Sequence, residues 1–228
     1  MIIAIDGPSG SGKSTTARKL AERLGYLYLD TGAMYRALAL AFLRSGLEPT
    51  PENARKLLAR LRLDVAHRNG VMRVFLDGED VSDRIRTPEV SAMASRISAL
   101  EPVRRKMVEA QRRIARDFTA KGGGVVVEGR DIGTVVFPDA EVKVFMVADP
   151  MERARRRQAE LKARGQEVDL DNVLAEIERR DRQDAGRALA PLRKAEDAIE
   201  IDTTNLTPDE QVAFIFNKVR ERIRTSEV

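Results

Sequence analysis

The chain of 228 residues contains no cysteine and a single histidine, His67. Without cysteine there is no disulfide, no thiolate metal site and no thiol nucleophile. One histidine argues against a metal site built from several imidazoles and against a Ser-His-Asp triad within one chain. We expect His67 to lie solvated on the surface, just before a hairpin turn at Asn69-Gly70.

Aromatic residues make up 4% of the chain, and long apolar runs are missing. Proteins that bind single-stranded nucleic acid depend on aromatic stacking, so the composition argues against that class. No apolar run approaches the ~20 residues of a membrane span, and Ile2–Ile5 is far too short for a signal peptide. We expect a cytoplasmic monomer whose partners include neither nucleic acid nor a membrane.

Charge of one sign is only slightly in excess, because 40 Lys and Arg face 36 Asp and Glu, a formal net charge of +4. With 43% hydrophobic and 33% charged residues, the chain resembles soluble globular proteins, and we expect one domain over residues 1–228. Arginine supplies 31 of the 40 basic residues. Guanidinium groups fit phosphate oxygens and stay charged when partly buried, so small anions are the expected partners.

Short apolar runs alternate with helical patterns, which predicts an α/β fold with a five-stranded parallel sheet flanked by helices. The predicted strands are Ile2–Ile5, Tyr26–Leu29, Val125–Glu128, Val142–Val147 and Ala198–Ile201. A helix over Lys13–Leu24 should end at Gly25. Further helices are predicted to start at Thr50-Pro51, Thr87-Pro88, Glu101-Pro102, Asp149-Pro150 and Thr207-Pro208.

The segment Leu63–Ile85 breaks this alternation. It carries Asn69-Gly70 and Asp77-Gly78, both typical of tight turns between antiparallel strands. We therefore expect a small antiparallel β insert within the α/β core.

Residues Gly7–Ser14 match G-x-x-x-x-G-K-[ST], the loop that wraps the phosphates of a nucleoside triphosphate. Its glycines let backbone N–H groups face the phosphates, and the helix that follows offers its positive N-terminal end. Lys13 would bridge the outer phosphates and Ser14 would ligate Mg²⁺. The expected ATP-binding residues are Gly7, Pro8, Ser9, Gly10, Ser11, Gly12, Lys13, Ser14 and Thr15.

The rest of the chain narrows the class of P-loop protein. A signalling GTPase needs a guanine-reading N-K-x-D motif, and Asn217-Lys218-Val219-Arg220 lacks the aspartate. An extended ATPase motor is hard to fit into this length. A small kinase therefore fits best.

Several arginines recur in patterned places. Arg36 and Arg130 follow predicted strands, where open α/β sheets bind ligands. Two sets would each share one helix face by their spacing: Arg180, Asp184 and Arg187, and Arg153, Arg156 and Arg157.

Five segments follow one another along the chain: "IDGPSGSGKST", "LDTGAMYRALA", "GEDVSDRIRTPEVS", "EGRDIGTVVFPDA" and "EIERRDRQDAGRALAPL". Together they closely resemble bacterial cytidylate kinase, a family of nucleoside monophosphate kinases that phosphorylate CMP and dCMP. The resemblance runs from Ile5 to about Leu206, and the last two segments are its most specific part. It implies in-line transfer of the γ-phosphate of ATP to CMP or dCMP, assisted by Mg²⁺ and an array of arginines.

The resemblance also implies roles for residues by their position. It assigns the cytosine to Ser95, Arg104 and Asp131, the acceptor phosphate to Thr31, Arg36, Arg130 and Arg187, and the ribose to Arg180 and Asp184. It makes Arg153, Arg156 and Arg157 arginines of a mobile helical lid. The catalytic set would be Lys13, Arg130, Arg153, Arg157 and Arg187. Residues 31–120 would bind the nucleoside monophosphate, with the β insert near 63–85, and residues 150–170 would form the lid.

A few positions depart from the pattern of the family. Thr31 stands where many relatives have serine, which keeps the hydroxyl group. Ser14 stands where some have glycine, so a side-chain Mg²⁺ ligand is available here. Gln183 and Ala185 stand where some have arginine and another polar residue, which lowers the local charge.

The chemistry of the residues agrees with the resemblance. Asp131 can accept a hydrogen bond from the amino group of cytosine, and Arg104 can donate to a ring acceptor. A CMP phosphate is already anionic, so its attack needs no general base. Catalysis then depends on positioning and on neutralising charge.

Two alternatives stay open at this point. The first is a kinase for UMP, AMP, shikimate or another hydroxyl compound, with Asp30 or Asp131 as a carboxylate base. The second is a P-loop protein that binds RNA or DNA through the arginine-rich helix 152–164, which steeply salt-dependent binding would reveal.

Overall fold

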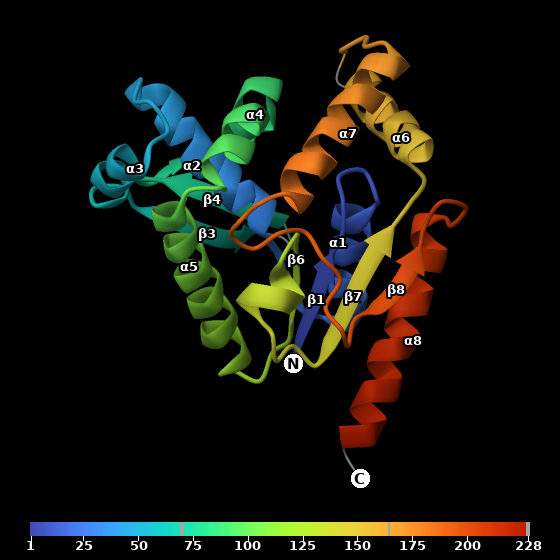
Figure 1. Cartoon of the computed structure of the whole chain (residues 1–228). Helices are drawn as coiled ribbons and strands as arrows, with labels where there is room; N and C mark the ends of the chain where they lie inside the picture. Colours follow the sequence, from blue (N-terminus) through green and yellow to red (C-terminus); the bar gives the residue numbers. More distant parts are fainter. Residues whose placement is uncertain (69–70, 164, 227–228) are drawn as a thin grey trace.

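The structure is a computed structural model that describes residues 1–68, 71–163 and 165–226. A five-stranded parallel sheet with the strand order β2-β6-β1-β7-β8 forms its centre (Figure 1). Its strands are β1 Ile2–Asp6, β2 Leu27–Asp30, β6 Val125–Gly129, β7 Val142–Val147 and β8 Ile199–Asp202. The predicted sheet is therefore confirmed, with strand ends shifted by one residue or left unchanged.

Helices cover both faces of the sheet, which explains why its strands are mostly apolar. The helices are α1 Lys13–Leu24, α2 Thr31–Ser45, α3 Pro51–Leu58, α4 Pro88–Ile97, α5 Glu101–Thr119, α6 Pro150–Lys162, α7 Leu170–Ala185 and α8 Pro208–Ser226. Ile3 and Ile5 of β1 belong to the core under α1 and α8, whereas Ala4 belongs to the core under α2 and α5. Alternate residues of one strand thus fill two cores.

The proline pairs begin helices as predicted. The side chains of Thr50, Thr87 and Asp149 accept hydrogen bonds from backbone N–H groups at the starts of α3, α4 and α6. At the start of α8, Thr207 and Glu210 bond each other's backbone N–H groups, as in a capping box. A short π-type turn at Ile132–Val136 was not predicted, because "IGTVV" carries no helix signal.

The insert consists of β3 Leu63–Arg68, β4 Val71–Leu76 and β5 Glu79–Asp80, which pair antiparallel, and is followed by a 3₁₀ turn at Arg84–Arg86. The turn at Asp77-Gly78 is confirmed, with left-handed φ angles of 49° and 87°. The turn predicted at Asn69-Gly70 lies outside the described residues. The prediction for His67 is wrong: its Nε2 lies 2.7 Å from the carbonyl oxygen of Tyr28 and so ties the insert to β2.

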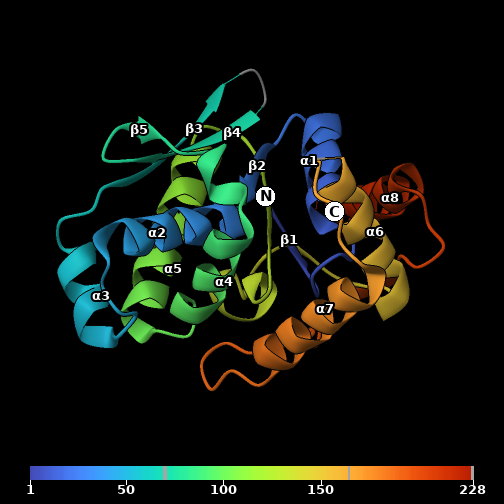
Figure 2. The ribbon, with the colours of Figure 1, turned by 90° about the horizontal axis from the view of Figure 1, so that it is seen from above.

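Helices α6 and α7 form a hairpin that stands above the ends of β7 and β8 (Figure 1). The hairpin has its own small apolar cluster, in which Ala154 of α6 packs with Val173 and Ile177 of α7. Arg164, between these helices, lies outside the described residues. Figure 2 shows α2–α5 gathered on one side of the molecule and α1, α6 and α8 on the other.

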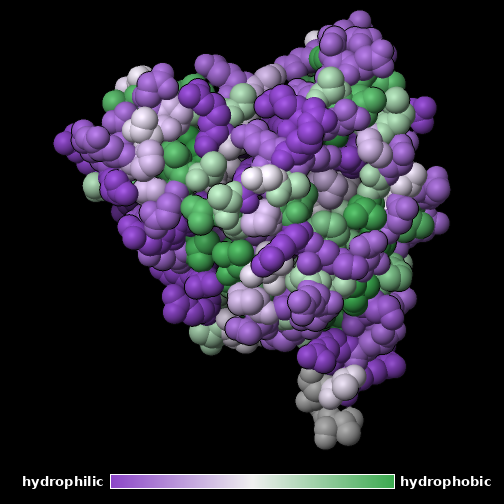
Figure 3. All heavy atoms as spheres, in the orientation of Figure 1, coloured by the Kyte–Doolittle hydropathy of each residue, from purple (hydrophilic) through white to green (hydrophobic). Residues whose placement is uncertain are grey.

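Hydrophilic residues dominate the face shown in Figure 3, including the notch between α4 and the α6–α7 hairpin. No helix of the described residues is long and apolar enough to cross a membrane.

The separate cluster of the hairpin generates a prediction about local stability. Ile177 is 3% exposed. Ile177→Ala should lower the free energy of unfolding of this hairpin cluster, and of no other part of the chain, by about 2–5 kcal/mol. Hydrogen exchange of the α7 amides should then accelerate by roughly thirtyfold or more, while the amides of β1 keep their rates. Leu20→Ala, in the sheet core, is the control and should lower the stability of the whole chain. Equal acceleration in α7 and β1 for Ile177→Ala would contradict a separate hairpin cluster.

Candidate active site

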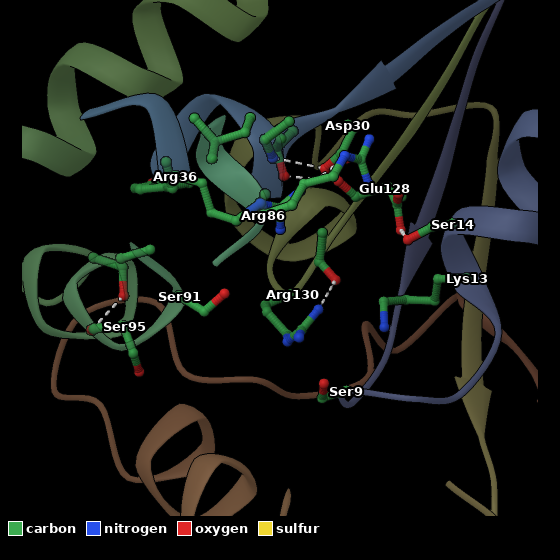
Figure 4. A pocket seen from close by; sticks show the side chains of 18 of the residues that line it. Ser9, Lys13, Ser14, Asp30, Arg36, Arg86, Ser91, Ser95, Glu128 and Arg130 are labelled. Carbon is green, nitrogen blue, oxygen red and sulfur yellow. Dashed lines mark hydrogen bonds and ion pairs between the residues drawn. The ribbon is translucent and has the colours of Figure 1, made fainter. Parts of the chain in front are cut away.

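A cavity of about 530 Å³ opens where the parallel strands end. Residues of the phosphate loop, of the β insert and of α7 line it. Eight arginines and one lysine line it against five carboxylates, so it favours a polyanionic ligand. The predicted site residues along its wall are Ser9, Gly10, Lys13, Ser14, Thr15, Thr31, Arg36, Ser95, Arg104, Arg130, Asp131, Arg157, Arg180, Asp184 and Arg187. Figure 4 shows Lys13, Ser14, Glu128 and Arg130 around the same open space.

The phosphate loop between β1 and α1 forms one end of the cavity. Gly7 has a φ of 149°, and a Cβ there would lie 2.1 Å from the carbonyl oxygen of Met146, so only glycine lets β1 turn here. Lys13 is 6% exposed and folds back on its own loop, donating to the Pro8 carbonyl at 2.5 Å. Burial is the main cause that lowers the pKa of Lys13 to about 7, and the positive charge of Arg130 is the second.

Carboxylates face the phosphate loop across the cavity. Ser14 Oγ donates to Glu128 Oε2 at 2.9 Å, and the hydroxyl of Tyr28 donates to Glu128 Oε1. Burial and the nearby Asp30 raise the pKa of Glu128. Sequence reasoning missed Glu128, although an acidic residue that ends a buried strand next to β1 is a signal that could have found it.

These oxygen atoms fit Mg²⁺, which prefers oxygen ligands and keeps several water or phosphate ligands. Ser14, Glu128 and Asp30 would hold the ion at the phosphate loop. No group of three or more His, Cys, Asp or Glu side chains in residues 1–68, 71–163 and 165–226 could hold a metal by itself. Phosphate oxygens would therefore complete the coordination.

The middle of the cavity is rich in guanidinium groups that have spare donors. Arg36 pairs with Asp30 at 3.1 Å, while Arg130 and Arg187 both pair with Asp184, at 2.9 and 2.5 Å. Within the described part of the chain, the Nε atoms of Arg36 and Arg187 are buried and have no hydrogen-bond partner. Such unpaired buried donors are costly unless an anion binds them.

A buried ion pair between Arg104 and Asp131 forms the end of the cavity opposite the phosphate loop. Each of the two residues is 6% exposed. Asp6, the last residue of β1, accepts hydrogen bonds from Ile132 N and Gly133 N at 2.9 and 2.7 Å. Asp6 thereby fixes the turn that presents Asp131 to the cavity. Burial raises the pKa of Asp131 in spite of the guanidinium of Arg104 beside it.

Helix α7 closes the cavity against α4. Ser95 Oγ donates to Gln183 Oε1 at 2.9 Å, and Arg180 Nη2 donates to the carbonyl of Ser91 at 3.3 Å. Arg187 was expected on the same helix, but α7 ends at Ala185 and Arg187 reaches Asp184 from the loop beyond it.

The three arginines of α6 were expected to share one face, and the structure turns them in three directions. Arg157 lines the cavity beside Glu160. Arg156 donates to the carbonyls of Thr203 and Thr204 at 2.7 and 3.1 Å, away from the cavity wall. Arg153 is buried at the root of the hairpin, where it does not line the cavity.

Four residues of the predicted ATP-binding set also lie outside the cavity wall: Gly7, Pro8, Ser11 and Gly12. Among them, Ser11 is buried and its hydroxyl donates to the Pro8 carbonyl at 3.1 Å, which holds the loop together from within.

Comparison with known proteins identifies close relatives. A family model described as cytidylate kinase matches residues 3–221. A cytidylate kinase of Salinibacter ruber is 57% identical over 220 residues, which cover 96% of this chain and 97% of the relative. A cytidylate kinase of Geobacter sulfurreducens is 52% identical over 227 residues, which cover 99% and 95%.

Similarity among solved structures is more remote and concerns the fold alone. An uncharacterized protein from Eubacterium ventriosum superposes with a TM-score of 0.50 at 15% identity, over 96% of this chain and 98% of that one.

The buried Lys13 generates a prediction about protons. With a pKa of about 7 in the free protein, Lys13 is mostly neutral at pH 8.5, and the phosphates of ATP should restore its charge. ATP binding should therefore take up close to one proton at pH 8.5 and almost none through Lys13 at pH 6, and affinity should fall as the pH rises above 7. Calorimetry in two buffers of different ionisation enthalpy measures the uptake. Lys13→Met should abolish it, and an unchanged uptake in that variant would assign the proton to another group.

Proposed function

The chain belongs to the cytidylate kinase family, and we propose that it transfers the γ-phosphate of ATP to CMP or dCMP. The observation that carries this proposal is one continuous cavity, which joins the phosphate loop at Lys13 to the Arg104–Asp131 pair through a wall of arginines. Such a cavity suits two nucleotides whose phosphates meet in its middle.

The donor end would hold the triphosphate. Backbone N–H groups of Gly7–Ser14 would surround the phosphates, and Lys13 would leave the Pro8 carbonyl to bridge the outer two. Mg²⁺ held by Ser14, Glu128 and Asp30 would neutralise phosphate charge there. Because the acceptor phosphate is anionic, the residues have to counter repulsion between two anions, and no proton needs to be removed.

The arginines in the middle of the cavity would counter the repulsion between the two phosphates. Arg36, Arg130 and Arg187 would hold the acceptor phosphate, and the unpaired Nε atoms of Arg36 and Arg187 are donors ready for it. Arg157 would approach from the hairpin and neutralise charge on the transferring group. Thr31 would contact the same phosphate, and Arg180 with Asp184 would contact the ribose.

The far end would read the base. Asp131 would accept from the amino group of cytosine while Arg104 and Ser95 contact the remaining edge. In this arrangement residues 31–120, which include the insert near 63–85, bind the monophosphate, and residues 150–170 act as the lid.

The proposal is tested by ADP release with a panel of acceptors. We expect CMP and dCMP to be phosphorylated with kcat/KM values well above those of UMP, AMP and shikimate. A clear preference for AMP or shikimate would overturn the proposed acceptor while leaving the donor site intact. Tight, steeply salt-dependent binding of RNA in a parallel gel shift would instead favour a nucleic-acid-binding protein.

The Arg104–Asp131 pair generates a prediction about base selection. UMP presents a carbonyl where CMP presents an amino group, so it places two acceptors against each other at Asp131. This mismatch should cost roughly 1–3 kcal/mol, or about ten- to a hundredfold in kcat/KM. Asp131→Asn offers an amide that can donate a hydrogen bond to the carbonyl of UMP. It should therefore lower kcat/KM for CMP and lower the ratio of kcat/KM for CMP to kcat/KM for UMP, both measured by steady-state kinetics.

The control for this experiment is Asp139→Asn, which makes the same change in charge at an exposed position. It should leave the CMP/UMP ratio unchanged. If Asp131→Asn keeps the ratio of the wild type, another residue reads the base.

A further inference from the structure

Arg153 joins three segments at the root of the α6–α7 hairpin. It is 5% exposed, and its Nη1 donates to the Ser9 carbonyl at 3.1 Å and to Asp181 Oδ2 at 2.6 Å. Its Nε donates to the carbonyl of Ala148, just beyond β7, at 3.1 Å. One guanidinium therefore connects the phosphate loop, the end of β7 and helix α7.

The contact between Arg153 and the phosphate loop is tight. Gly10 lines the cavity with a φ of 78° and lies directly against Arg153, because a Cβ at Gly10 would sit 3.0 Å from both the Cβ and the carbonyl oxygen of Arg153. The Cβ and the backbone of Arg153 thus pack directly against the loop. A shift of Gly10 toward α6 would therefore press on the first turn of that helix.

Asp181 is the partner of Arg153 on helix α7. It forms its ion pair with Arg153, and its Oδ1 is buried without a partner in the described part of the chain. On the same helix, Arg180 and Asp184 line the cavity, where they contact Ser91 and Arg130. Because the three residues share helix α7, a movement of the helix at Asp181 would also move both cavity residues.

We propose that the Arg153–Asp181 ion pair is a positioning element that couples occupancy of the phosphate loop to the placement of Arg180 and Asp184 on α7. A bound triphosphate would fix Ser9 and Gly10, and through Arg153 it would fix α7 in the orientation that receives the acceptor nucleotide. The two nucleotides then bind cooperatively, and the coupling is reciprocal. This inference rests on the proposed function, because it takes α7 to contact the acceptor.

The burial of Arg153, which is 5% exposed, explains why the pair can transmit such a signal, although the side chain of Asp181 is 24% exposed. An exposed pair exchanges readily with water and contributes little. A buried guanidinium that loses its carboxylate is left as an uncompensated charge, so the geometry of the Arg153–Asp181 pair is held firmly. Glu178 and Arg182 provide the contrast on the same helix, since they form an exposed pair at 3.7 Å.

The test measures the Kd of CMP by calorimetry with and without a non-hydrolysable ATP analogue. In the wild type we expect the analogue to tighten CMP binding about tenfold. Asp181→Asn should bring this ratio close to one, with the Kd of the analogue alone changed less than about threefold. Glu178→Gln, the matched control, makes the same change in charge and should keep the wild-type ratio.

A second variant keeps the test decisive if Asp181→Asn does not fold. Asp181→Glu retains the charge but displaces the carboxylate by one methylene, so it should give an intermediate ratio and a raised KM for CMP at an unchanged KM for ATP. A wild-type ratio in whichever variant folds, or a ratio of one in the wild type, overturns the coupling. An enzyme that phosphorylates CMP yet shows no coupling refutes the pair alone, whereas failure to phosphorylate CMP refutes the proposed function.

Discussion

Buried charge at the carboxyl edge of the parallel sheet is the constraint on which the site depends. Lys13, Glu128, Arg104 and Asp131 are all nearly inaccessible to water, and ionised groups in such places need partners. The strand order provides them, because β1 lies beside β6 and so brings the phosphate loop next to Glu128 and Arg130. The fold thus places opposite charges within reach before any ligand binds.

The pairing is incomplete, and the remaining imbalance is informative. Arginines outnumber carboxylates along the cavity, buried Nε atoms of Arg36 and Arg187 lack partners, and burial lowers the pKa of Lys13 to about 7. Each of these features is unfavourable in the free protein and is relieved by an anion. A phosphate bound in the cavity would therefore gain binding free energy by offsetting unfavourable electrostatic interactions of the empty site.

The α6–α7 hairpin shows how a fold can assign different tasks to neighbouring residues of one type. Arg153, Arg156 and Arg157 follow within five positions, yet they contact the phosphate loop, the loop after β8 and the cavity, respectively. Helical geometry turns successive side chains by about 100°. The hairpin is thus anchored on two sides, while Arg157, which pairs with Glu160 at 3.0 Å, lines the cavity.

The sequence by itself determined the phosphate loop, the parallel sheet, the insert and the starts of α1, α3, α4, α5, α6 and α8, because each depends on local signals such as glycine spacing, apolar runs and capping residues. The starts of α2 and α7 were not predicted. It did not determine the partners of buried side chains. Three contacts join segments that lie 39 to 127 positions apart in the sequence: Asp6 holds the turn that follows Asp131, Glu128 faces Ser14, and His67 bonds the backbone of Tyr28. Only the tertiary structure brings such residues together, since a hydrogen bond is set by distance in space and leaves no period in the sequence.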